Sequence, residues 1–201
     1  MKNASFIQVS AGELAADKKR LLTYLLQKEG IQLLNSEHIP VKESSDAPPL
    51  SFSQQRLWFL HQLEPANAVY NIGRAERLNG RLDIAVLERC LKEMALRHEI
   101  LRTSLASLDG RLVQVVAQQT ELTLPLVDLQ RLSEIERNVE VYRIIKDQVR
   151  FAFDLASGPL LRLMLIRLGS EEHIMVLVVN QIIFDGWSFG IFFRELSILY
   201  E

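Results

Sequence analysis

The chain has 201 residues, of which 48% are hydrophobic and 24% charged, and its formal net charge is −2. This length and composition normally give one globular domain with a sizeable core, or most of one. The weak net charge argues against a nucleic-acid partner. The longest apolar run, residues 174–179, is too short to span a bilayer, so we expect no membrane partner. A single cysteine, Cys90, cannot form an internal disulfide, which favours a reducing, cytoplasmic compartment.

The first 49 residues separate into a predicted helix and a predicted linker. Ser10 and Glu13 have the spacing of a capping box, and leucines at helical spacing predict a helix over residues 10–29. We therefore assign residues 1–34 to an amino-terminal helical segment, and residues 35–49, rich in serine and proline, to a linker. Two interpretations stay open: the helix packs on the following domain, or it is a docking element for a partner protein.

Residues 50–201 alternate between helical and strand-like patterns. The last two strands are joined by a short polar connection typical of a hairpin, and apolar residues on both of their faces predict a central sheet covered on each side. We expect an α+β fold with a mixed or antiparallel sheet and flanking helices. The predicted helices are residues 51–63, 83–98, 133–149 and 187–200, and the predicted strands are residues 69–78, 112–116, 122–127, 160–168 and 173–181.

Apolar residues at helical spacing indicate how two of these helices present a face to the core. In the helix over 83–98, Cys90 shares a face with Leu87 and Met94, which predicts a buried structural thiol rather than a nucleophile. In the helix over 133–149, the apolar residues at helical spacing are Ile135, Val139, Tyr142, Ile145 and Val149.

The most informative stretch is the polar segment between the last strand and the last helix, Asn180-Gln181-Ile182-Ile183-Phe184-Asp185-Gly186-Trp187-Ser188. Its polar side chains emerge where the sheet stops and a loop can meet a ligand. Gln181 can orient a group by hydrogen bonding but cannot take up a proton near neutral pH. Taken alone, the pattern indicates a turn residue at Asp185 and a helix cap at Ser188.

Three further segments resemble characteristic motifs of one family. Together with the Asp185 segment, they occur in the same order as the motifs of that family and cover about three quarters of the chain. The family that they resemble is the condensation domains of nonribosomal peptide synthetases. The family's active-site motif is His-His-x-x-x-Asp-Gly, and here Asn180 and Gln181 stand at the two histidine positions. The three segments are Leu50-Ser51-Phe52-Ser53-Gln54-Gln55-Arg56-Leu57-Trp58-Phe59-Leu60, Arg97-His98-Glu99-Ile100-Leu101-Arg102-Thr103, and Phe153-Asp154-Leu155 with the following Gly158-Pro159-Leu160-Leu161-Arg162.

The resemblance implies a chloramphenicol-acetyltransferase-like fold of two lobes around a tunnel, with residues 50–201 as the amino-terminal lobe. It implies amide-bond formation between an acyl donor and an amine acceptor, both carried as thioesters on the phosphopantetheine arms of carrier proteins. It also implies an ion pair between Asp185 and an arginine. Arg97 is the first candidate for this arginine, and Arg102 and Arg162 are the next. The implied catalytic positions are Gln181, Asp185 and Gly186, and the supporting positions are Asn180, Arg97, Arg102, Trp187 and Ser188.

The implied partners are carrier proteins, neighbouring synthetase modules and a carboxy-terminal lobe that would complete the tunnel. We expect no cofactor and no metal bound by this chain, since the sequence has no phosphate-binding glycine loop and no metal-ligand spacing. Two functions stay open. The chain is half of an amide-forming enzyme, inactive alone, or it is a non-catalytic relic or docking scaffold of a peptide or polyketide assembly line, because Gln181 is not a base.

Overall fold

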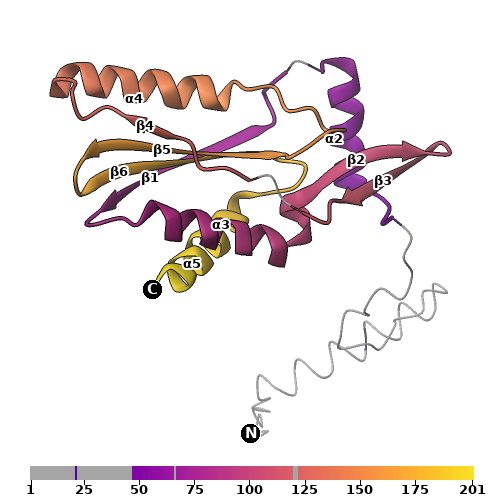
Figure 1. Ribbon diagram of the computed structural model, residues 1–201. Helices are drawn as coiled ribbons and strands as arrows, with labels where there is room; N and C mark the ends of the chain where they lie inside the picture. The colour runs from indigo at the N-terminus through magenta and orange to yellow at the C-terminus, as the bar shows by residue number, and fades with distance from the viewer. Residues whose placement is uncertain (1–20, 22–46, 66, 120–121) are drawn as a thin grey trace, which may run out of the picture. The chain divides into compact units, whose positions relative to one another are not determined.

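The computed structural model describes residues 21, 47–65, 67–119 and 122–201 (Figure 1). The chain divides into two compact units, Met1–Ser45 and Asp46–Glu201, and the helices and strands named below belong to the second. Apart from residue 21, the predicted helix over residues 10–29 lies outside the described residues, and so does most of the predicted linker.

A four-stranded mixed sheet forms the centre of the second unit. Its strand order is β1-β6-β5-β4, in which β4 pairs parallel with β5 and the other pairs are antiparallel. Every residue of β6 after its first is buried, because β6 is a central strand with packing on both faces. The prediction of a mixed or antiparallel sheet is thus confirmed, and the parallel pair β4–β5 makes the sheet mixed. The strands are β1 (Asn71–Asn79), β4 (Leu126–Asp128), β5 (Leu161–Gly169) and β6 (Glu172–Asn180).

Helices cover both faces of this sheet (Figure 1). Helix α4 (Glu134–Val149) lies on one face and contacts β1, β5 and β6. Helices α3 (Ile84–Arg97) and α5 (Gly186–Tyr200) lie together on the other face. The prediction that both faces are covered is therefore confirmed, and the core lies between the sheet and these helices. Cys90 on α3 is buried in this core, as its position among apolar residues predicted.

The remaining elements lie beyond one end of the sheet. They are α2 (Phe52–Leu63), the short 3-10 helix η1 (Glu99–Arg102), and a hairpin of β2 (Thr103–Leu108) and β3 (Arg111–Val116). The sequence interpretation missed β2. Its turn carried a usable signal, since Asp109 and Gly110 adopt positive φ values of 49° and 76°, and Asp-Gly favours this conformation in hairpins.

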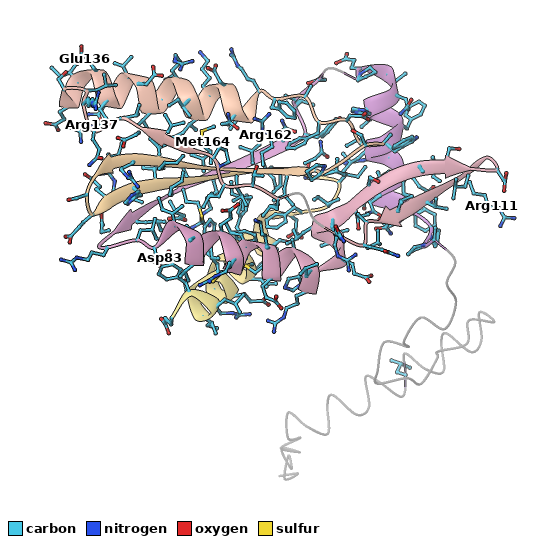
Figure 2. The ribbon with its side chains drawn as sticks, viewed as in Figure 1. Asp83, Arg111, Glu136, Arg137, Arg162 and Met164 are labelled. Carbon is cyan, nitrogen blue, oxygen red and sulfur yellow. The ribbon has the colours of Figure 1, made fainter. Side chains whose placement is uncertain are left out.

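Side-chain caps explain where the helices begin. The side chain of Asp83 accepts the backbone N–H of Val86 at the start of α3. At the start of α4, Ser133 and Glu136 form a reciprocal capping box, which satisfies backbone N–H groups that have no partner inside the helix. Asp83 and Glu136 mark these two helix starts in Figure 2.

Two sequence predictions are corrected. The strand predicted over residues 122–127 begins only at Leu126, and Pro125, which has no N–H to give to a sheet, stands just before it. On α4, Ile135, Val139 and Tyr142 are exposed, so they do not face the core. The inward face of this helix includes the buried Ile144, and Ile145 and Val149 of the predicted stripe pack against the core, so the sheet contacts only the carboxy-terminal part of that stripe.

Candidate active-site loop

The loop between β6 and α5, residues 181–185, is short and tightly bonded to its surroundings. Its entry is held by the backbone N–H of Gln181, which donates to the carbonyl of Tyr70 at 2.8 Å. The backbone N–H of Ile183 donates to the carbonyl of Asn180 at 3.1 Å, which makes a turn directly after the strand. The turn reverses the chain so that α5 starts beside the sheet end.

Asn180 holds this turn from inside the protein. Its side chain is buried, and its carboxamide oxygen accepts the backbone N–H of Ile182 at 3.0 Å. Asparagine forms such local bonds readily, and here the bond satisfies a donor that the turn would otherwise leave unpaired. Asn180 therefore acts on the loop backbone from the buried side, whereas the side chain of Gln181, in the turn directly after β6, is exposed.

Gln181 is exposed and lines an open hollow of about 1000 Å³. Among the described residues, no hydrogen bond joins the Gln181 carboxamide to another side chain or backbone group. Its amide can therefore turn toward a ligand, both as a donor and as an acceptor. The other walls of the hollow come from the start of α2, from η1 and from the start of α5, with Ser53, Gln54, Arg56, Ile100, Asp185 and Ser188 among its lining residues.

Asp185 caps α5 instead of pairing with an arginine. Its carboxylate accepts the backbone N–H of Ser188 at 2.9 Å and the hydroxyl of Ser188 at 2.7 Å. These bonds, the hydroxyl first, lower the pKa of the Asp185 carboxyl below its usual range, so the group stays ionised near neutral pH. Within the described part of the chain, Asp185 has no ion pair. The expected salt bridge is therefore not formed in this lobe.

The three candidate arginines have other partners. The guanidinium of Arg97 lies 3.8 Å from the carboxylate of Glu195 on α5. Arg102 donates to the carbonyl of Ala117 and lies 3.6 Å from the carboxylate of Glu99.

Arg162 lies on the sheet face that α4 covers, together with Met164 (Figure 2), and its guanidinium stands 3.9 Å from the ring centroid of Phe151. The three arginines thus contact neighbouring parts of the fold and not Asp185. Asp185 caps α5 through Ser188 instead of forming the expected ion pair.

Gln54 is a site residue that the sequence interpretation passed over. Its side-chain N–H₂ donates to the carbonyl of Ile182 at 3.2 Å, and to the Oε1 of Gln114 on β3 at 3.4 Å. Its Oε1 accepts the backbone N–H of Ser51, as the second half of the α2 capping box. The Ser-x-x-Gln spacing of that box was visible in the sequence, but the contact with Ile182 was not.

A second, mostly apolar hollow of about 510 Å³ lies between α3 and α5 and shares Ile100, Ile183, Phe184 and Ser188 with the first. At its edge the Nε2 of His98 lies 2.6 Å from the carboxylate of Glu195. This contact lowers the pKa of the Glu195 carboxyl. His98 thus joins η1 to α5, and it does not line the hollow that holds Gln181.

Gly186 and Trp187 begin α5 at the protein surface. Trp187 is 87% exposed, and a Cβ at Gly186 would meet no atom within 4 Å. Space therefore does not require glycine at position 186 in this lobe. The large exposed indole is an apolar surface beside the loop, available to a partner.

The chemistry that the Gln181 hollow offers is hydrogen bonding and orientation. Its charged lining groups are Arg56 and Asp185, and the lowered pKa of the Asp185 carboxyl keeps that group ionised near neutral pH. In the described part of the chain, no cluster of three or more His, Cys, Asp or Glu side chains is placed to hold a metal ion. No helix among the described residues has the length and apolarity to cross a bilayer.

The fold and the loop together define a lobe of an acetyltransferase-like domain that presents a polar loop at the sheet end. The family model of the condensation domain matches residues 44–201. The chain belongs to the condensation-domain family.

Comparisons with known proteins agree with this assignment. The chain is 42% identical to a chondramide synthase of Chondromyces crocatus over 156 residues, which are 78% of this chain and 4% of that protein. The fold is similar to the first condensation domain of the CDA synthetase, with a TM-score of 0.73 and 25% identity, over 78% of this chain and 40% of that one. It also resembles the starter condensation domain of rhizomide synthetase, with a TM-score of 0.72 and 22% identity, over 78% and 38% of the two chains.

The chain spans less than half of the solved condensation domains that it resembles, and a few per cent of the chondramide synthase. The predicted family and acetyltransferase-like fold are confirmed.

Proposed function

We propose that residues 50–201 are the amino-terminal lobe of an amide-forming condensation domain, in which Gln181 orients the reacting groups. The observation that carries the proposal is the exposed carboxamide of Gln181, which has no partner among the described residues, in an open hollow on a loop that Asn180 and Gln54 hold in place. The proposed substrates are an acyl thioester and an aminoacyl thioester, each carried on the phosphopantetheine arm of a carrier protein.

In this reaction the amine attacks the thioester carbonyl, the carbon–nitrogen bond forms and the carbon–sulfur bond breaks. The proton that the amine loses ends on the leaving thiolate. The Gln181 carbonyl can accept one N–H of the amine and so direct its lone pair, but it cannot remove the proton. A positioned acid or base typically raises the rate about 10²- to 10⁴-fold. Turnover with Gln181 is therefore expected to be lower than with a histidine at this position by about this factor.

A non-catalytic docking scaffold is the second candidate function. It is favoured because the described lining residues of the hollow include no histidine and no cysteine. Carrier proteins and neighbouring synthetase modules are the proposed partners in both cases. The two candidates differ in whether the loop contributes to turnover.

The test combines the full chain with the carboxy-terminal lobe of a related condensation domain and two loaded carrier proteins. Acyl transfer is followed by mass spectrometry for the wild type, Gln181→Ala and Gln181→His, with Gln118→His, outside the hollow, as the matched control. If Gln181 orients the amine, Gln181→Ala lowers turnover. Gln181→His raises it and adds a pH dependence near the ordinary histidine pKa of about 6.5.

Each other outcome is informative. Turnover that is equal in the wild type and Gln181→Ala contradicts an orienting role. No product from the wild type or Gln181→His, together with retained binding of carrier protein, favours the scaffold.

A further inference from the structure

We propose that Gln54 is a positioning residue that holds the Gln181 loop at its working geometry. The contact joins two segments that lie 128 residues apart along the chain, the first turn of α2 and the loop after β6. The accepting carbonyl belongs to Ile182, the residue that directly follows Gln181. A shift of this carbonyl therefore moves the backbone next to Gln181.

The loop has few other anchors on this side. The backbone bonds of Gln181 and Ile183 run to Tyr70 and Asn180, which fix the end of the loop next to the sheet. The carbonyl of Ile182 points the other way, toward α2, and the Gln54 side chain is the described group that donates to it. Without that donor, the α2 side of the loop has no described hydrogen bond to hold it.

Gln54 is itself oriented by its neighbours. Its Oε1 is held at 2.9 Å by the backbone N–H of Ser51, so its N–H₂ must turn away from the helix, toward the loop. The Nε2 of Gln54 also donates to the Oε1 of Gln114 at 3.4 Å, and the N–H₂ of Gln114 in turn donates to the carbonyl of Pro49. A chain of amides thus runs from the segment before α2, through β3 and α2, to the loop, and such chains hold their members in one arrangement.

The capping geometry allows the two roles of Gln54 to be separated. In Gln54→Glu the carboxylate still accepts from Ser51, so the capping box survives, and a negative charge in the first turn of a helix is favourable. The same change removes the N–H donor and sets a carboxylate against the carbonyl of Ile182. The variant therefore keeps α2 and releases the loop.

Gln55→Glu is a matched control on the same turn of α2. Its side-chain N–H₂ donates to the carbonyl of Leu50 at 3.0 Å, so the change again removes one donor to a backbone carbonyl and adds one charge. Gln55 does not line the hollow. Gln54→Met, of similar length but without charge, separates loss of the donor from charge repulsion.

The test is hydrogen exchange of the full chain, read by mass spectrometry on peptides that cover the loop, α2 and β6. We expect the loop amides of residues 182–184 to exchange about two- to ten-fold faster in Gln54→Glu and Gln54→Met, as loss of one hydrogen bond implies. In Gln54→Glu, exchange in α2 and β6 stays as in the wild type, and Gln55→Glu leaves the loop unchanged. Loop exchange that does not rise in Gln54→Glu, or that rises as much in Gln55→Glu, overturns the proposal.

The consequence for turnover rests on the proposed function, whereas the exchange result does not. In the two-lobe assay, Gln54→Glu is expected to lower kcat with little change in KM, because the loop orients the reacting groups after binding. A wild type without turnover would refute the proposed function and leave the exchange result to decide the role of Gln54. A loop released by Gln54→Glu with unchanged kcat would show that Gln54 does not position the loop for the reaction.

Discussion

Replacing Asn180 with alanine removes the acceptor of the Ile182 backbone N–H while leaving β6 and its pairing in place. The bond measures 3.0 Å, and the Asn180 side chain is buried, with 6% of its surface exposed. Leaving a buried donor unpaired costs about 1–3 kcal/mol. For a unit of this size each kcal/mol lowers Tm by about 2–4 °C, so we expect a drop of about 2–12 °C for Asn180→Ala.

Thermal unfolding followed by circular dichroism measures this drop. Asn138→Ala, at an exposed position of α4, is the matched control and should not lower Tm, because alanine is the better helix former. An Asn180→Ala protein that melts with the wild type would refute the reasoning. It would mean that the turn after β6 does not depend on the Asn180 side chain.

Three further predictions concern other parts of the lobe. Asp185→Ala should lower Tm because α5 loses its N-terminal cap. Asp185→Asn keeps an acceptor and should lower Tm less, so an equal drop in both variants would contradict the capping role. Gly73→Ala should lower the free energy of unfolding, measured by chemical denaturation, by about 1–3 kcal/mol, because the new Cβ would stand 2.8 Å from a methyl group of Val149. If Val149→Ala does not relieve this loss in the double variant, the clash is not its cause. Burial, and then the charge of Arg167, lower the pKa of His173 in the folded protein. As pH falls below about 6.5, His173 therefore takes up a proton in the unfolded chain before it does so in the folded one. Stability is then full above that pH and is lost as pH falls toward the folded pKa, and His173→Gln should flatten the dependence of Tm on pH between about 7.5 and about 5.

The sequence by itself determined the elements whose signals are local. The helices α2, α3, α4 and α5, and the hairpin of β5 and β6, follow from hydrophobic periodicity and capping residues, which act between residues a few positions apart. The four motifs in order were enough to identify the family and the fold. The missed strand β2 also had a local signal, the Asp109-Gly110 turn.

Only the tertiary structure decided which groups meet across the chain. The sequence offers several arginines as ion-pair partners for Asp185. Their positions along the chain could not show that Arg97 pairs with Glu195, or that Asp185 bonds to Ser188. The apolar residues on α4 did not show which of them would meet the sheet. Gln54 and Ile182 lie far apart along the chain, and the packing of α2 against the end of the sheet brings them together. Long-range contacts of this kind depend on how whole elements pack, and local patterns do not encode that choice of partner.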